Sequence, residues 1–249
     1  MSQVPGKKHR LDLIIVEKGL VKSRQRARAL IMAGRVVVND KPVDKPGFFV
    51  SSEDKIEFRG DDNPYVSRGG LKLEAALQNL ALNVSGAVCI DVGASTGGFT
   101  DCLLQRGAER VYAVDVGYGQ LAWKIRQNKN VIVIERTNVR YMPDDKIPEP
   151  VDLITIDVSF ISLKIVVPAV IRFLKHDASI LALIKPQFEV GKGQVGKGGV
   201  VKEPYIHQKV ITELTDFFST AQLAPQSVYA SPLLGPKGNR EFFIFLNRQ

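Results

Sequence analysis

The chain has 249 residues, of which 45% are hydrophobic and 24% are charged, and its formal net charge is +8. This size suits one large hydrophobic core, or one core beside a small second domain. The sequence lacks the roughly 18 uncharged apolar residues of a membrane-spanning helix, and its basic start is not followed by the apolar segment of a secretory signal. Its two cysteines, Cys89 and Cys102, are expected to be reduced core thiols in a cytoplasmic protein.

Positive charge is concentrated near the start of the chain. Residues 7 to 35 contain nine Lys or Arg and two acidic residues, so this segment carries +7 of the total of +8. A local excess of this kind favours binding to a polyanion such as a nucleic acid.

The same region predicts two short helices followed by short strands. An apolar stripe over residues 11–16 indicates the first helix, which ends at Gly19. Ser23 is a good N-cap for the second helix, and Gly34 suits the left-handed position that follows a helix. The following residues alternate strand-like segments with turns, so we expect a small α+β domain here.

From residue 65 onward, apolar runs alternate with helix-like segments. The runs are VCIDV (88–92), RVYAVDV (110–116), VIVI (131–134), DLITIDV (152–158) and SILALI (179–184). Such alternation predicts a mostly parallel sheet with helices on both faces, and two last strands joined by a Gly/Pro turn predict an antiparallel pair. We therefore expect an α/β protein with domains at 1–62 and 65–249 and a linker at 59–64.

The Gly-rich turn DVGASTGG, at residues 91–98, ends the first strand of this expected sheet, where ligands bind in α/β folds. It matches neither a phosphate loop nor the pattern G-x-G-x-x-G. Asp91 beside the turn would repel a pyrophosphate and favour a cationic ligand such as S-adenosylmethionine. Asp115, which follows the second strand, would accept ribose hydroxyls, and Asn138 would bond an adenine edge. A nicotinamide or flavin site and a purely structural turn remain alternatives. The expected contact residues are Asp91, Gly93, Ala94, Ser95, Gly97, Gly98, Asp115 and Asn138.

Four charged residues lie within or next to elements that are otherwise largely apolar. Asp157 and Lys185 end two strands, Glu241 begins the last strand, and Lys72 lies on an amphipathic helix before the sheet. If the last strand is antiparallel to its neighbours, these groups could converge at one rim. A salt bridge at the rim or a solvated side chain is the alternative interpretation of each residue taken alone.

Seven motifs then carry a resemblance to a known family, in the same order along nearly the whole chain. They are YVSRGGLKL, DVGASTGGFTDCLL, VDVGYGQL, ERTNVR, DVSFISL, IKPQFE and GNREFF. The sequence resembles the TlyA family of ribosomal RNA 2′-O-methyltransferases, often labelled hemolysin A, which are similar to FtsJ-type enzymes. The resemblance implies a Rossmann-like class I methyltransferase domain with a mostly parallel seven-stranded sheet, and an S4-like RNA-binding domain before it. It also implies a Lys-Asp-Lys-Glu tetrad at Lys72, Asp157, Lys185 and Glu241.

A general base must accept the proton of a ribose 2′-hydroxyl as the methyl group transfers. A lysine can do this when burial and a neighbouring cation favour its neutral form. We expect Lys185 to be the base and Asp157 and Glu241 to hold the two ammonium groups. Lys72 would favour the neutral form of Lys185 or stabilise developing alkoxide charge. No metal site is expected, and the three histidines, His9, His176 and His207, are interpreted as surface residues.

Basic side chains are expected to bind RNA phosphates. The candidates are Arg10, Lys22, Arg24, Arg28 and Arg35 in the first domain, and Arg68, Arg136, Arg140 and Lys192 in the second. Lys192 lies in a Gly-rich loop at 191–199, which would be a lid or RNA clamp, or else a flexible connection.

The family implies a cytidine in 23S rRNA, and in some members also one in 16S rRNA. Because the chain ends right after its last strand, we expect the 23S class, with the 50S subunit as the favoured partner and a monomeric protein. The rival hypotheses are a pore-forming hemolysin, a ribosome-binding module without catalysis, and a nicotinamide enzyme.

Overall fold

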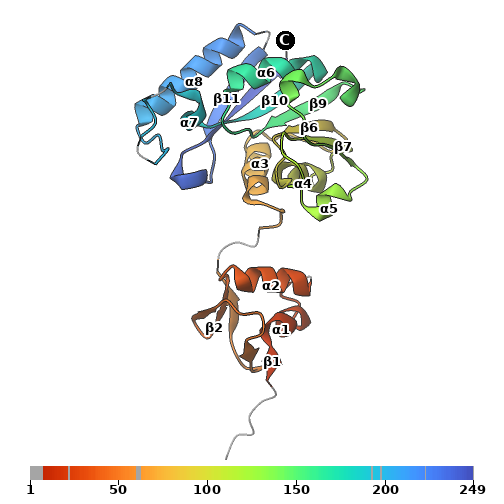
Figure 1. Cartoon of the computed structure of the whole chain (residues 1–249), viewed down its shortest axis with the longest axis vertical. Coiled ribbons are helices and arrows are strands. Elements are labelled where there is room, and N and C mark those ends of the chain that lie inside the picture. Colours follow the sequence, from red (N-terminus) through yellow and green to blue (C-terminus); the bar gives the residue numbers. More distant parts are fainter. Residues whose placement is uncertain are drawn as a thin grey trace, which may run out of the picture. The chain divides into compact units, whose positions relative to one another are not determined.

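The computed structural model describes residues 8–21, 23–59, 63–191, 193–196, 198–221 and 223–248. The chain divides into two compact units, Met1–Asp62 and Asn63–Gln249. Each is described by itself (Figure 1).

The first unit combines two helices with short antiparallel strands. Helix α1 (Leu11–Glu17) and helix α2 (Arg24–Met32) pack their apolar faces on a sheet of order β3-β2-β5. Its strands are β2 (Val36–Val38), β3 (Lys41–Val43) and β5 (Ile56–Phe58), and a separate pair joins β1 (His9–Arg10) to β4 (Phe49–Val50).

Local signals in the sequence determine these elements. The Ser23 hydroxyl accepts a hydrogen bond from the Arg26 N–H at 3.2 Å, which caps α2. Between β2 and β3, Asn39 and Asp40 both have positive φ angles, of 47° and 64°, as the favoured two-residue hairpin turn requires. The expected helices are confirmed, whereas β1 and β4 are too short to produce a periodic pattern and were not predicted.

The second unit is built on a seven-stranded sheet of order β11-β12-β10-β9-β6-β7-β8. The strands are β6 (Val88–Val92), β7 (Arg110–Val114), β8 (Val131–Ile134), β9 (Val151–Ile156), β10 (Leu174–Ile184), β11 (Leu223–Ala230) and β12 (Phe242–Arg248). All paired neighbours are parallel except those of β12, which runs antiparallel to both β10 and β11. The mostly parallel α/β sheet is thus confirmed.

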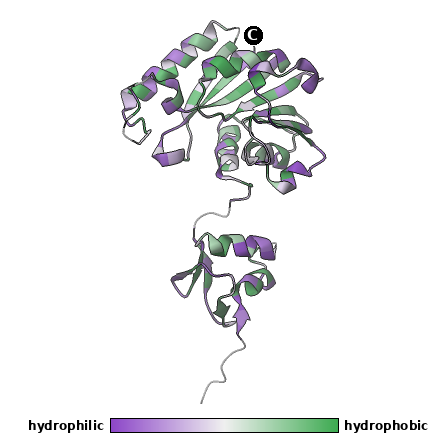
Figure 2. Ribbon diagram, in the orientation of Figure 1, coloured by the Kyte–Doolittle hydropathy of each residue, from purple (hydrophilic) through white to green (hydrophobic). Residues whose placement is uncertain are grey.

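Helices cover both faces of this sheet (Figure 1). Helices α3 (Arg68–Asn79), α4 (Gly98–Gln105) and α5 (Trp123–Arg126) pack on one face, and α6 (Leu163–Val170) and α8 (Pro204–Ser219) pack on the other. Short segments complete the unit: α7 (Pro186–Glu189), η1 (Val139–Tyr141), η2 (Asp144–Lys146), η3 (Ile171–Phe173) and η4 (Pro236–Gly238). In Figure 2 the strands are mostly hydrophobic, whereas the helices alternate between hydrophobic and hydrophilic residues, which matches a sheet buried on both faces.

The antiparallel course of β12 decides which residues meet at the rim of the sheet. Ile184, the last residue of β10, pairs with Phe242, the first residue of β12. Lys185 and Glu241, which flank this pair, are therefore brought to the same edge although 56 residues separate them in sequence. Among the described residues, no helix is both long enough and apolar enough to cross a membrane.

Candidate active site

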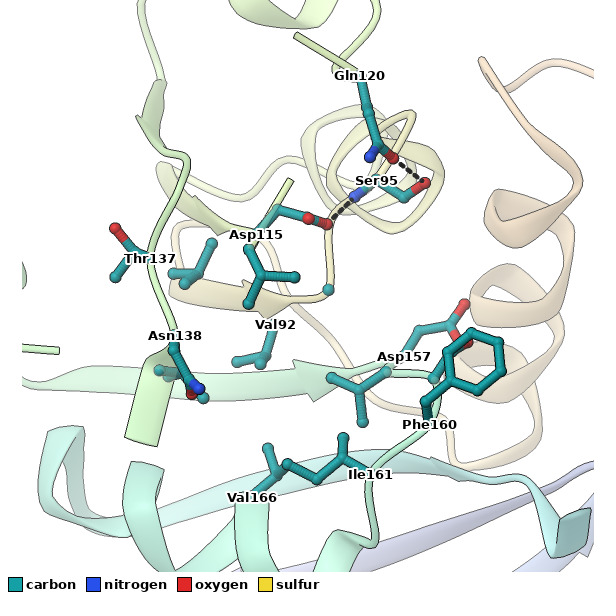
Figure 3. Close-up of a pocket in the computed structure, with 16 residues that line it drawn as sticks. Val92, Ser95, Asp115, Gln120, Thr137, Asn138, Asp157, Phe160, Ile161 and Val166 are labelled. Carbon is teal, nitrogen blue, oxygen red and sulfur yellow. Dashed lines mark hydrogen bonds between the residues drawn. The ribbon is translucent and has the colours of Figure 1, made fainter. Parts of the chain in front are cut away.

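A cavity of about 490 Å³ lies beyond the carboxyl ends of β6, β7 and β9, where an α/β sheet binds ligands. Figure 3 shows the polar groups of Ser95, Asp115 and Gln120 gathered on one wall, with the apolar side chains of Ile161 and Val166 below them. We call this space the first cavity.

The carboxylate of Asp115 is held at the wall of the first cavity by two backbone donors. Its oxygens accept hydrogen bonds from the Ser95 N–H and the Gly117 N–H, each at 2.7 Å. The Ser95 hydroxyl is 3.4 Å from the Gln120 side-chain oxygen. Asn138 also lines the cavity, and its side chain accepts a bond from the Arg140 N–H at 3.1 Å. A fixed carboxylate and an amide beside apolar walls fit a ribose and a flat base.

Asp91 does not line this cavity, which corrects the expectation that it meets the ligand. Its carboxylate is fully buried and accepts bonds from Thr100, from the backbone N–H at 2.9 Å and from the hydroxyl at 2.6 Å. Burial raises the pKa of Asp91 to about 7. The carboxylate therefore holds the first turn of α4 against β6.

The other expected contact residues of the turn divide into two groups. Gly93, Ala94, Ser95 and Gly98 line a cavity, whereas Gly97 does not. Gly93 has a φ of 85°, and a Cβ there would lie 2.5 Å from the backbone oxygen of Asp157. A Cβ on Gly98 would lie 2.1 Å from the Ser67 hydroxyl, so this glycine permits the close packing of α3 on α4.

A second cavity, of about 380 Å³, adjoins the first. The two share Gly93, Ser95, Asp157 and Ser159 as lining residues. The second is also lined by Ser67, Arg68, Lys72, Lys185, Gly235 and Pro236. A group bound in one cavity can therefore meet a group bound in the other.

Two ammonium–carboxylate pairs lie at the second cavity. Lys185 Nζ is 2.6 Å from Asp157 Oδ1, and Lys72 Nζ is 2.6 Å from Glu241 Oε2. Glu241 is 1% exposed, and both lysines are 9% exposed. The structure thus brings all four sequence-predicted charged residues together. Lys72, Asp157 and Lys185 line the cavity, and Glu241 contacts Lys72.

The sequence analysis did not predict two residues of this site. Ser159, two residues after Asp157, accepts a hydrogen bond from Lys185 Nζ at 3.1 Å. A Cβ on Gly235 would lie 1.9 Å from Glu241 Oε1, so only a glycine leaves room for that carboxylate. Ser159 stands in the motif DVSFISL, two residues after Asp157, and this spacing was the signal that the sequence offered for it.

The basic residues of the first unit are not equally free to bind a phosphate. Arg10 and Arg24 both contact Asp12, each at 3.0 Å, and the Asp12 side chain is fully buried. Although burial alone raises the pKa of Asp12, the two guanidinium groups hold it below its usual value. Arg28 is exposed and Arg35 is half-buried. Lys22 lies outside the described residues.

In the second unit, Arg68 lines the second cavity, whereas Arg136 and Arg140 line neither cavity. Instead, Arg136 lies over the ring of Tyr118 at 4.0 Å, and Arg140 lies over Tyr141 at 4.9 Å. Lys192 falls outside the described part of the chain.

The structure corrects one interpretation of the histidines. His207 is buried, and its Nε2 lies 2.9 Å from the Val201 carbonyl oxygen, so it is a core residue rather than a surface one. Within the described ranges, no group of three or more His, Cys, Asp or Glu side chains is placed to hold a metal ion.

Comparisons with known proteins agree with this geometry. Residues 65–248 match the model of FtsJ-like methyltransferases, and residues 9–56 match the S4 domain. The 16S/23S rRNA (cytidine-2′-O)-methyltransferase TlyA of Mycobacterium tuberculosis is 46% identical over 245 residues, which cover 98% of this chain and 91% of that protein. The chain belongs to the TlyA family.

Two further relatives show the range of this family. The 23S rRNA (cytidine-2′-O)-methyltransferase TlyA of Campylobacter jejuni is 32% identical, with 92% of this chain and 96% of that protein covered. A solved structure from Streptococcus thermophilus that bears a hemolysin name superposes with a TM-score of 0.76 at 43% identity, over 97% of this chain and 89% of that one. The resemblance to TlyA, the methyltransferase fold of the second unit and the S4 domain are thereby confirmed.

Proposed function

We propose that this TlyA-family protein methylates the 2′-hydroxyl of a cytidine ribose in ribosomal RNA, with S-adenosylmethionine as methyl donor. The reaction and substrate are those named for its relatives from M. tuberculosis and C. jejuni. The observation that carries the proposal is the pair of lysine–carboxylate contacts at the second cavity, which shares four lining residues with the first.

The first cavity fits the methyl donor. The Asp115 carboxylate, fixed by the Ser95 and Gly117 N–H groups, would accept the ribose hydroxyls. Asn138 would face the base, while Val92, Ile161 and Val166 provide the apolar surface that a flat ring needs. S-adenosylmethionine, when bound, supplies an electrophilic methyl group. Gly93, which lines both cavities, leaves space for that group to face the second one.

Lys185 would then be the general base. Its Nζ reaches the second cavity and would accept the proton of the 2′-hydroxyl as the new bond to oxygen forms. Asp157, at 2.6 Å, orients the amine and stabilises the ammonium that results. Lys72 would stabilise charge developing on the ribose oxygen, and Glu241 holds Lys72 in place.

We further propose that residues 1–62 form the RNA-binding domain, that residues 65–249 form the catalytic domain, and that 59–64 link them. Exposed Arg28 and half-buried Arg35 would contact phosphates in the first domain, and Arg68 would guide the RNA backbone into the second cavity. The protein would act as a monomer in the cytoplasm, where ribosomes are. Because the 16S/23S relative is more similar than the 23S relative, both subunits should be tested as substrates.

The test is transfer of labelled methyl from S-adenosylmethionine to 50S and 30S subunits that lack the modification. Lys175 offers a matched control for Lys185: it lies on β10, the strand that Lys185 follows, and pairs at 2.7 Å with Asp152, which lies on β9. We expect Lys185→Ala to lose transfer and Lys175→Ala to retain it. Donor binding without transfer to either subunit would contradict the substrate, and absence of donor binding would contradict the assignment of the first cavity.

A further inference from the structure

Two side chains from one short segment hold the amine of Lys185. Asp157 Oδ1 lies 2.6 Å from Nζ, and Ser159 Oγ accepts a hydrogen bond from Nζ at 3.1 Å. Asp157 and Ser159 directly follow β9, and Lys185 follows the neighbouring strand β10. The amine therefore has two fixed contacts that come from a single, adjacent stretch of backbone.

The backbone of this segment is itself held in place. The Asp157 N–H donates to the Val92 carbonyl at 2.9 Å, which continues the sheet past the end of β9. Phe160 is 89% exposed and has a φ of 65°, a left-handed conformation that costs energy for a non-glycine residue. Its ring lies 4.8 Å from that of Phe188, and the Phe188 N–H bonds to the Lys185 carbonyl at 2.8 Å. The segments at 157–160 and 185–188 are thus joined beyond the Lys185 contacts.

We propose that Ser159 is a positioning residue that fixes the direction of the Lys185 lone pair. This inference rests on the proposed function, in which Lys185 accepts the proton of the 2′-hydroxyl. A neutral amine has two hydrogens and one lone pair in a tetrahedral arrangement. With one hydrogen donated to Ser159 and the nitrogen held 2.6 Å from Asp157 Oδ1, the lone pair is confined to the positions that remain.

The location of Ser159 supports this role. Ser159 lines both cavities, so its hydroxyl stands where the methyl donor and the ribose would meet. Lys185 lines the second cavity and is otherwise buried, so the position left open at Nζ is the one available to a ribose hydroxyl. The proton that leaves the hydroxyl would pass to the lone pair, while an electron pair of the oxygen forms the bond to the methyl carbon. The bond from that carbon to the donor's sulfur would break at the same time, and its electrons would stay on the sulfur of S-adenosylhomocysteine. With Asp157 as its single anchor, the amine could rotate and the lone pair would lose its fixed direction.

The experiment compares Ser159→Ala with Ser159→Thr, which retains the hydroxyl. We expect the alanine variant to lower kcat about tenfold, the effect of one lost positioning hydrogen bond, with KM for RNA and donor within about twofold of wild type. Threonine should restore kcat to within about threefold. Ser179→Ala is the matched control, because it removes a hydroxyl in the middle of β10 that is bonded to Asn247 at 2.9 Å, and it should leave kcat unchanged.

A second readout requires no methyl transfer. Limiting acetic anhydride modifies free amines, and the extent at Lys185 is measured by mass spectrometry. We expect about threefold faster labelling of Lys185 in Ser159→Ala than in wild type, with Ser159→Thr close to wild type. Equal labelling in all three proteins would overturn the contact on which the inference depends.

The outcomes separate this inference from the proposed function. An unchanged kcat in Ser159→Ala, or a rise in KM for the donor alone, would overturn the positioning role and leave methyl transfer intact. If wild type transfers no methyl to any ribosomal RNA, the proposed function fails. The labelling rates then still decide whether Ser159 holds Lys185.

Discussion

The buried pair of Lys72 and Glu241 should make the stability of the second unit depend unequally on its two members. The Glu241 side chain is fully buried and the Lys72 side chain is 11% exposed at the second cavity. Within the described residues, Glu241 Oε1 has no hydrogen-bond partner, so Lys72 is the group that compensates this charge. Removing Lys72 therefore leaves a desolvated carboxylate, whereas removing the charge of Glu241 leaves an ammonium that can still reach the cavity.

The expected costs follow from this asymmetry. Breaking a buried pair costs about 3–5 kcal/mol, because the remaining charge is unpaired. We place Lys72→Met at about 4–5 kcal/mol and Glu241→Gln at about 2–3 kcal/mol, since the glutamine amide can still accept a bond from Lys72. The double variant Lys72→Met/Glu241→Gln removes both charges and should lose only about 1–2 kcal/mol, less than either single variant.

Calorimetric unfolding of the full chain measures these differences, because the longer second unit gives the larger heat. For a unit of this size, each kcal/mol lowers Tm by about 2–4 °C, so Glu241→Gln should melt roughly 4–12 °C below wild type. Lys72→Met should melt lower still, and the double variant should recover part of the loss. Single variants that each cost under about 1 kcal/mol and add in the double variant would show that the pair is not coupled, which would refute the reasoning.

Further predictions concern pH, RNA binding and a buried loop contact. A hydrogen bond from Arg106 lowers the pKa of Glu74 to about 2. The stability that Glu74 adds is therefore present above its usual pKa near 4.5 and is lost as pH falls towards 2. Glu74→Gln should have a lower denaturant midpoint than wild type at pH 7, and the two midpoints should converge in acid. Burial raises the pKa of Asp91 to about 7, so as pH rises this carboxyl ionises in the unfolded chain before it does in the folded one. The free energy of unfolding should therefore fall between about pH 4 and about pH 7. Asp91→Asn should reduce this dependence on pH in the same denaturation series. Arg28→Ala should weaken RNA binding in a filter assay and reduce the slope of log affinity against log salt by about 0.7–0.9, if Arg28 contacts one phosphate. Asn239→Ala should cost about 2–4 kcal/mol in urea unfolding, because the buried Asn239 side chain bonds both the Val201 N–H and the Gly199 carbonyl.

Much of the architecture was predictable because strand cores are apolar and parallel strands end at one edge. The runs at 88–92 and 152–158, for example, predicted β6 and β9 and placed the Gly-rich turn and Asp157 at the rim. The placement of Lys185 and Glu241 at the same edge of the sheet followed from one further assumption, the antiparallel last strand, which the pairing of β10 with β12 confirms.

The direction of individual side chains was not predictable in the same way. A strand that is buried on both faces has no polar alternation, so nothing in VCIDV shows that Asp91 points inward to Thr100. Likewise, a count of arginines does not reveal that Arg10 and Arg24 share the buried Asp12. Such contacts depend on packing between segments that are distant in sequence.

The central claim is that Lys185 takes the proton from a ribose 2′-hydroxyl, and nucleoside mass spectrometry of reacted ribosomal RNA tests it most directly. Unmodified 50S and 30S subunits are incubated with S-adenosylmethionine and wild type, Lys185→Ala or Lys175→Ala, and the RNA is digested to nucleosides. The account predicts 2′-O-methylcytidine with wild type and Lys175→Ala, and its absence with Lys185→Ala. A methyl group found on a base, or 2′-O-methylcytidine formed equally well by Lys185→Ala, would contradict it.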